Sequence, residues 1–172
     1  MNTVKIMSGK YRGRVLSTPG GATHPMGARE KLALFNMLAP YLEGSLVLDA
    51  YAGSGALGIE ALSRGALKAT FIEKNRAAAR VIMQNLADLS LVGNVYAGPV
   101  QQFESGELFD LILADPPYDD FRLEEIASLA QFLSSDGILA LSHPGEAPEI
   151  AGLKLLKTNQ YAAAHLSLYV KQ

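Results

Sequence analysis

Apolar and polar positions recur along the chain in two patterns, which predict strands and helices in alternation. Short runs that are apolar on both faces predict buried strands, and apolar positions three and four residues apart predict amphipathic helices. The predicted strands are 4–7, 14–18, 46–49, 69–73, 94–97, 109–114, 137–142, 153–158 and 164–169. The predicted helices are 28–38, 56–64, 76–89 and 123–132, the first of them ending before Pro40. This alternation favours an α/β fold, with a mostly parallel sheet covered by helices on both faces.

The composition is that of a globular protein. The 172 residues are 49% hydrophobic and 19% charged, which fits one domain with a sizeable core. The chain has no cysteine, which excludes disulfide bonds and thiolate metal sites. His24, His143 and His165 are isolated along the chain, so we expect no metal site. No apolar run has the length of a signal peptide or a membrane span, so we expect a cytoplasmic protein without a membrane partner.

Positive charge is concentrated near the start of the chain. Residues 1–31 carry a net charge of +5, whereas the rest of the chain sums to −7. Basic residues surround one aromatic residue in the turn between the first two predicted strands, and a further arginine opens the first helix. They are Lys10, Tyr11, Arg12, Arg14 and Arg29. Such a set suits contact with the phosphates and bases of a nucleic acid, although a solvated basic edge would have the same composition.

The stretch 46–60 combines a buried strand, a glycine-rich turn and the start of a helix. The strand ends at Asp49, and Gly53 and Gly55 open a match to the Gly-x-Gly-x-x-Gly fingerprint of dinucleotide-binding turns. Glycine lets a ligand lie against the backbone, while the first amides of the helix face that ligand. Glu73 ends the next strand, where an acid can bind both ribose hydroxyls of an adenosine cofactor. These residues predict an adenosine ligand without saying which one.

Three acids, Asp49, Glu73 and Asp115, each follow or end a predicted strand. Because the carboxyl ends of parallel strands meet at one edge of a sheet, we expect the three side chains to share a ligand-binding edge. This argument depends on no single motif.

The segment 115–118, Asp-Pro-Pro-Tyr, follows an apolar strand at that edge. The two prolines hold the backbone extended, so that the Asp115 carboxylate and the Pro116 carbonyl become two acceptors pointing the same way. Two close acceptors suit an amine with two N–H bonds, and Tyr118 adds a flat face for a ring. Such a site would hold the exocyclic amine of a nucleobase and turn its lone pair toward an electrophile. The matching electrophile is the sulfonium methyl group of S-adenosylmethionine.

These motifs resemble those of class I amino-methyltransferases. More narrowly, the stretches 9–14, 34–38 and 53–66 resemble the RsmD-type bacterial family, which methylates the N2 amine of a guanine in small-subunit ribosomal RNA. The resemblance implies a Rossmann-like, seven-stranded sheet in a methyltransferase domain over residues 41–172. It also implies a short hairpin and helix over residues 1–40 that contact RNA. We expect a monomer whose cofactor is S-adenosylmethionine and whose partner is ribosomal RNA or the small-subunit particle.

The resemblance assigns roles to individual residues. The implied cofactor contacts are Asp49, Ala50, Tyr51, Gly53, Gly55, Glu73, Lys74, Gln101 and Asp115. The implied catalytic residues are Asp115 and Pro116, which hold the amine, and Tyr118, which stacks on the base. The implied RNA contacts are the five residues of the basic turn and first helix named above.

Two segments depart from the family pattern. Where the family reads Arg-Pro-Thr-Thr-Asp-Arg-Val-Arg-Glu, residues 24–32 lack the charges at His24, Ala28 and Leu32. Where related enzymes often place an acid near the adenine amine, residues 98–101 read Gly-Pro-Val-Gln. Gln101 or a backbone carbonyl is therefore expected to take the place of that acid.

Three other functions stay open. A DNA adenine-N6 or protein-glutamine N-methyltransferase would use the same amine site. A nicotinamide-dependent oxidoreductase would use the glycine turn, but it needs a substrate-binding half and a proton donor, for which the chain has little room. A non-catalytic RNA-binding module would leave the cofactor motifs unexplained.

Overall fold

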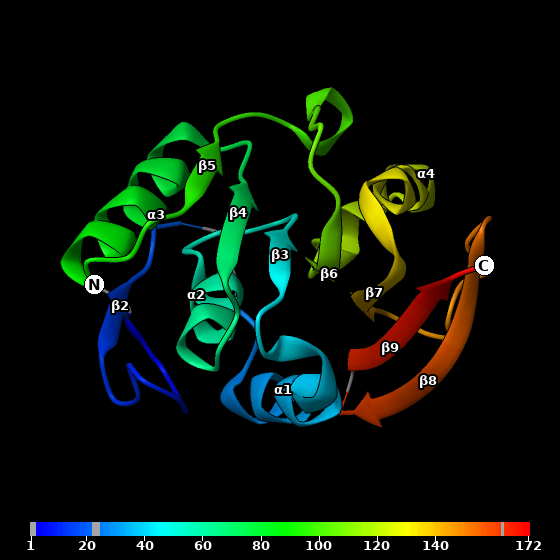
Figure 1. The fold of residues 1–172 in the computed structure, drawn as a ribbon, viewed down its shortest axis with the longest axis horizontal. Coiled ribbons are helices and arrows are strands. Elements are labelled where there is room, and N and C mark those ends of the chain that lie inside the picture. Colours follow the sequence, from blue (N-terminus) through cyan, green and yellow to red (C-terminus); the bar gives the residue numbers. More distant parts are fainter. Residues whose placement is uncertain (1–2, 22–24, 163) are drawn as a thin grey trace.

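The computed structural model describes residues 3–21, 25–162 and 164–172, which form a seven-stranded sheet and a separate two-stranded hairpin (Figure 1). The sheet has the order β5-β4-β3-β6-β7-β9-β8. Its strands are β3 (Leu46–Asp49), β4 (Lys68–Ile72), β5 (Asn94–Tyr96), β6 (Phe109–Ala114), β7 (Leu133–His143), β8 (Leu153–Tyr161) and β9 (Ala164–Lys171). The neighbours among β5, β4, β3, β6 and β7 pair in parallel, and β9 is antiparallel to β7 and β8. The predicted α/β fold with a mostly parallel sheet is confirmed.

Helices cover both faces of the sheet. They are α1 (Ala28–Leu42), α2 (Ala56–Ser63), α3 (Arg76–Asp88) and α4 (Leu123–Ser128), with 3₁₀ turns η1 (Val100–Gln102), η2 (Tyr118–Asp120) and η3 (Leu129–Phe132). Successive residues of β3 point to opposite faces, so Val47 joins the core under α1, α2 and α3, and Leu48 joins the core under α4. Within the described ranges, no helix is long and apolar enough to cross a membrane.

The N-terminal hairpin consists of β1 (Thr3–Lys5) and β2 (Val15–Ser17) and packs beside α2 and α3 (Figure 1). Its connecting loop lies against the end of α2, where the Ser63 hydroxyl accepts the Tyr11 amide at 2.9 Å. Gly9 has a φ of +83°, and a Cβ atom there would lie 1.8 Å from the Ser63 carbonyl oxygen, so only glycine fits this contact. On the other side, the Ser17 amide donates to the Asn85 side chain of α3 at 2.9 Å. The extension is thus fixed to helices α2 and α3.

Several predicted element ends differ from the structure by one to four residues, and the differences at α1, β7 and α4 have local causes. Helix α1 continues through Pro40 to Leu42, because a proline in the last turn removes only one backbone hydrogen bond. Strand β7 begins at Leu133, before the predicted 137, because it pairs with Phe109 and then shifts register before continuing along β6. The predicted helix over 123–132 is α4 followed by η3.

Candidate functional site

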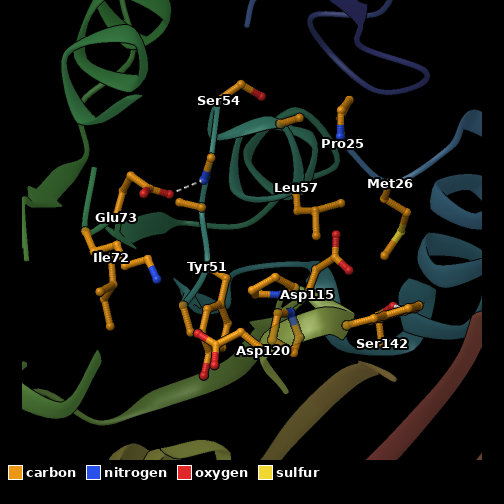
Figure 2. A pocket seen from close by; sticks show the side chains of 18 of the residues that line it. Pro25, Met26, Tyr51, Ser54, Leu57, Ile72, Glu73, Asp115, Asp120 and Ser142 are labelled. Atoms are coloured by element: carbon orange, nitrogen blue, oxygen red, sulfur yellow. Dashed lines mark hydrogen bonds between the residues drawn. The ribbon is translucent and has the colours of Figure 1, made fainter. Parts of the chain in front are cut away.

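A cavity of about 990 Å³ opens at the carboxyl edge of the parallel strands. It is lined by the turn after β3, the end of β4, the loop after β6, η1, α4 and the segment that leads into α1. Figure 2 shows Glu73 at one end of the cavity and Met26 and Ser142 at the other, with Tyr51 and Asp115 between them. Both Glu73 and Asp115 line this one cavity, which places the predicted cofactor and amine motifs together.

Glycine shapes the turn after β3. Gly53 has a φ of +56°, and a Cβ atom built there would meet nothing within 4 Å. The backbone of this turn is therefore open to a ligand. Gly55 (φ +82°) precedes α2 as its N-cap but does not line the cavity, whereas Ala50, Tyr51 and Gly53 do.

Asp49 is fully buried at the end of β3 and is not among the cavity-lining residues. Its Oδ2 accepts the Gly58 amide at 2.9 Å, while Oδ1 is buried without a hydrogen-bond partner among the described residues. Burial raises the pKa of Asp49 to about 7; the Gly58 hydrogen bond opposes this rise, and the charges of Asp115 and Glu73 add to it. Asp49 therefore supplies a buried acceptor oxygen behind the glycine turn.

Glu73 follows β4 and is held in position by two backbone amides. Its Oε2 accepts the Gly53 amide at 2.8 Å (Figure 2) and its Oε1 accepts the Asn75 amide at 2.8 Å. The carboxylate thus joins the glycine turn to the start of α3, and Lys74 beside it also lines the cavity. Each oxygen keeps a further lone pair that can accept a hydroxyl hydrogen.

The Asp-Pro-Pro-Tyr segment lines the cavity beyond the end of β6. Pro116 is buried, Asp115 is partly buried and Tyr118 is 38% exposed. Burial raises the pKa of Asp115 to about 6, and a hydrogen bond with Ser142 acts in the opposite direction. The Tyr118 hydroxyl is hydrogen-bonded to the Ser142 hydroxyl, which comes from β7. The pKa of Asp115 is therefore close to neutral pH, and the hydroxyl of Tyr118 in the same segment is held by Ser142.

A second set of side chains lies near η1. The Gln101 amide nitrogen donates to Glu125 Oε2 at 2.9 Å, and the Tyr51 hydroxyl donates to Glu125 Oε1 at 3.2 Å. Burial, together with the Glu125 charge, raises the pKa of Tyr51, so its hydroxyl stays protonated. The sequence analysis predicted Gln101 and Tyr51 as cofactor contacts but did not identify Glu125, the acid of α4 to which both are hydrogen-bonded.

The predicted RNA contacts fall into two groups. Lys10, Arg12 and Arg14 are exposed on or beside the hairpin loop, with Arg14 donating to the Asp88 carbonyl of α3 at 3.3 Å. Tyr11 is half-buried, packs against the core and carries the Lys10 ammonium over its ring at 5.5 Å. This loop contacts the end of α2 that is farther from the cavity. Arg29, by contrast, is exposed in the first turn of α1, next to the cavity-lining Glu30.

Glu60 of α2 was not singled out from the sequence, yet it fixes the N-terminal segment to the sheet. The side chain is fully buried and accepts the amides of Met7 and Ser8 at 3.0 Å and 3.1 Å. Arg64 Nε lies 3.0 Å from Glu60, and Lys31 Nζ lies 3.6 Å from it. The sequence signal for this role was an acid inside the apolar stretch 56–62, because a charge buried there needs partners.

His165 is isolated along the chain but not in the fold. His143 and His165 are paired across β7 and β9, with ring centroids 5.6 Å apart. His143 Nε2 lies 2.7 Å from the Ser167 hydroxyl, and burial lowers the pKa of His143. His24 lies outside the described residues.

The fold and the family match define the class of this protein, a methyltransferase. A solved structure described as "Putative methyltransferase yhhF from Escherichia coli" matches with a TM-score of 0.89 and 32% identity, covering 99% of each chain. A family model described as "Conserved hypothetical protein 95" matches residues 4–170. The chain belongs to this family, which contains the RsmD- and YlbH-type methyltransferases, so the resemblance in its motifs is confirmed.

Two curated relatives carry names that mention ribosomal RNA. "Putative rRNA methyltransferase YlbH" of Bacillus subtilis is 33% identical over 98% of this chain and 100% of its own. Ribosomal RNA small subunit methyltransferase D of Escherichia coli is 39% identical over 80% of this chain and 70% of its own.

Proposed function

We propose that this protein transfers a methyl group from S-adenosylmethionine to the exocyclic N2 amine of a guanine in bacterial small-subunit ribosomal RNA. The observation that supports it best is that one continuous cavity is lined by both Glu73 and Asp115. The proposal would have been excluded if these two acids lay on opposite sides of the molecule. The printed names of the two curated relatives favour ribosomal RNA as the substrate.

The residues of the cavity fit S-adenosylmethionine. The backbone at Gly53 is open to a ligand, and each oxygen of the Glu73 carboxylate, which is bound to the same turn, can accept a further hydrogen bond. Glu73 would hold the ribose hydroxyls, and Asp49, from behind the turn, would hold its shape through the Gly58 amide. When bound, the cofactor supplies an electrophilic methyl group on a positively charged sulfur.

Asp115 and Pro116 would bind and orient the target amine. The Asp115 carboxylate and the Pro116 carbonyl accept its two N–H bonds, which directs the nitrogen lone pair away from both acceptors. With a pKa of about 6, Asp115 is mostly ionised at neutral pH, so it could accept the proton that N2 would release as the methyl carbon bonds to N2 and its bond to sulfur breaks. The ring of Tyr118 would stack on the base, which has to leave the RNA stack to reach it.

The test is the Asp115→Ala variant, with a labelled methyl donor and small-subunit particles or ribosomal RNA as substrate. We expect unchanged cofactor affinity and at least a 100-fold loss of turnover, since positioning of the amine would be lost. Asp119→Ala removes an exposed acid of the same loop and is the matched control. Full methyl transfer by Asp115→Ala would overturn the proposal.

Mapping methylated nucleotides in ribosomal RNA from a strain that lacks this protein would identify the target. A panel of DNA and protein substrates tests the adenine-N6 and glutamine alternatives with the same labelled donor. Melting shifts with S-adenosylhomocysteine and with a nicotinamide dinucleotide distinguish the two cofactor classes, because only a bound ligand stabilises the fold.

A further inference from the structure

The segment that leads into α1 forms the wall of the cavity at the Asp-Pro-Pro-Tyr end. Met26 and Glu30 line the cavity together with Asp115 and Tyr118, and Figure 2 shows Met26 with Ser142, away from Glu73. This end is where a base held by Asp115 would lie. The wall comes from the N-terminal extension and not from the strand-end motifs that define the cofactor end.

Glu30 offers an unengaged carboxylate in this wall. Within the described ranges it makes no hydrogen bond or ion pair, because the next residue, Lys31, turns to the Lys5 carbonyl at 3.2 Å and to Glu60. The carboxylate lies over Gly27, where a Cβ atom would come within 2.3 Å of Oε2. Burial raises the pKa of the Tyr118 hydroxyl, and the Glu30 charge adds to this rise; both side chains line the same cavity.

The other acids that line the cavity are engaged or lie elsewhere. Glu73 is bound by two backbone amides, and Glu125 is bound by Tyr51 and Gln101. Asp120 forms an ion pair with a neighbouring arginine at 2.8 Å. Asp119 is exposed in η2 and, unlike Glu30, is not among the charges that act on the Tyr118 hydroxyl.

We infer that Glu30 accepts the N1–H of the guanine whose N2 amine is held by Asp115 and Pro116, and so selects guanine over adenine; this assignment rests on the proposed function. In guanine, the reacting amine has a second donor, N1–H, as its neighbour on the Watson–Crick edge. In adenine, the atom beside the amine is N1, an acceptor. A carboxylate at this place attracts the first edge and repels the second.

The experiment compares methyl transfer to a short RNA that carries the mapped guanine with transfer to the same RNA carrying 2-aminopurine there. The analogue keeps the 2-amine but has an acceptor at N1. We expect wild-type protein to prefer guanine about 10- to 100-fold in kcat/KM, as for a charge-assisted hydrogen bond. Glu30→Ala should reduce the preference below about threefold, and Glu30→Gln, which keeps a neutral acceptor, should retain part of it.

Two controls separate recognition from folding. Asp119→Asn removes another carboxylate from the cavity and should keep the wild-type preference. Gly27→Ala keeps Glu30 but displaces its carboxylate, because Gly27 has an ordinary extended backbone (φ −61°) and only the new methyl group intrudes; it should lower the preference as Glu30→Ala does.

Unchanged S-adenosylhomocysteine affinity in every variant would show an intact cofactor end. A Glu30→Ala variant that methylates guanine with the full wild-type preference would overturn the assignment. Absence of guanine methylation by the wild-type protein would instead overturn the proposed function, and the assignment with it.

Discussion

The hydroxyl groups of Tyr118 and Ser142 are hydrogen-bonded to each other, which joins the loop after β6 to the end of β7 inside the cavity. Ser142→Ala should therefore free the Tyr118 ring and lower kcat about tenfold, with cofactor affinity unchanged. The free energy of unfolding should fall by about 1 kcal/mol, the usual net value of one hydrogen bond. Steady-state kinetics, calorimetric titration with S-adenosylhomocysteine and urea unfolding measure the three quantities.

A double-mutant cycle with Tyr118→Phe is the control for this prediction. If the hydrogen bond carries the effect, the double variant should lose no more activity than Ser142→Ala alone, which also loses the hydrogen bond to Asp115. Simple multiplication of the two losses would show that the hydroxyl groups act independently and would contradict the prediction.

Methyl transfer should depend on pH through Asp115. Burial raises the pKa of this carboxyl to about 6, against the opposing hydrogen bond with Ser142. Only the ionised form accepts an amine N–H and its proton, so kcat should rise from pH 5 to 7 and then level. The Ser142→Ala profile should shift to higher pH, because the opposing hydrogen bond is lost. Identical profiles for wild-type and Asp115→Asn proteins would show that another group titrates.

The stability of the fold should depend on pH through Asp49. Burial raises its pKa in the folded protein to about 7, whereas in the unfolded chain it titrates near its ordinary value of about 4. Between these values the folded state binds more protons, so the free energy of unfolding falls as pH rises, by up to about 4 kcal/mol. Urea unfolding at pH 4.5, 6 and 8 measures this fall.

Asp49→Asn is the matched variant for the stability prediction, since it keeps an acceptor for the Gly58 amide. Its unfolding free energy should change less with pH than that of the wild type. A pH dependence equal to that of the wild type would assign the fall to other groups.

Glu60 should be important for stability although it lies outside the cavity. Glu60→Ala leaves Lys31 and Arg64 without their buried partner and removes the acceptor of two backbone amides. Loss of one member of a buried ion pair costs about 3 to 5 kcal/mol, measured here by urea unfolding. Glu60→Gln keeps an acceptor and should cost less. A loss below about 1 kcal/mol for the alanine variant would contradict the central role of this side chain.

The hairpin loop should make RNA binding sensitive to salt. Lys10 and Arg12 are exposed and make no ion pair within the described ranges. The Lys10→Ala/Arg12→Ala double variant should reduce the slope of log affinity against log salt by about 1.4 to 1.8, since each phosphate contact contributes about 0.7 to 0.9. Fluorescence anisotropy at several salt concentrations measures the slope. An unchanged slope would show that the loop is not a phosphate contact.

Local patterns predicted that three acids meet at one edge of the sheet, because each acid ends or follows a strand. Asp49, Glu73 and Asp115 end or follow apolar runs, and parallel pairing brings such ends to one edge whatever lies between them. Spacing does not show which way a side chain turns. Asp49 therefore lies behind the glycine turn, bound to Gly58, and does not line the cavity.

The substrate end depends on contacts between distant residues, which periodicity cannot show. Ser142 looked like an ordinary strand residue until pairing of β6 with β7 placed it beside Tyr118. Glu125 lies 24 residues from Gln101 in the chain, yet the two side chains are hydrogen-bonded. Likewise, His165 is brought to His143 only by the antiparallel pairing of β9.

Helix α2 begins at the glycine turn and ends at Ser63, whose carbonyl and hydroxyl accept the amides of Lys10 and Tyr11. Eight residues of helix span roughly 12 Å, so a short rigid spacer separates the reaction end from the basic loop. An RNA that engages both must present a phosphate group at a matching distance from its extruded base. Such a spacing would select RNA by its folded shape before any base is recognised.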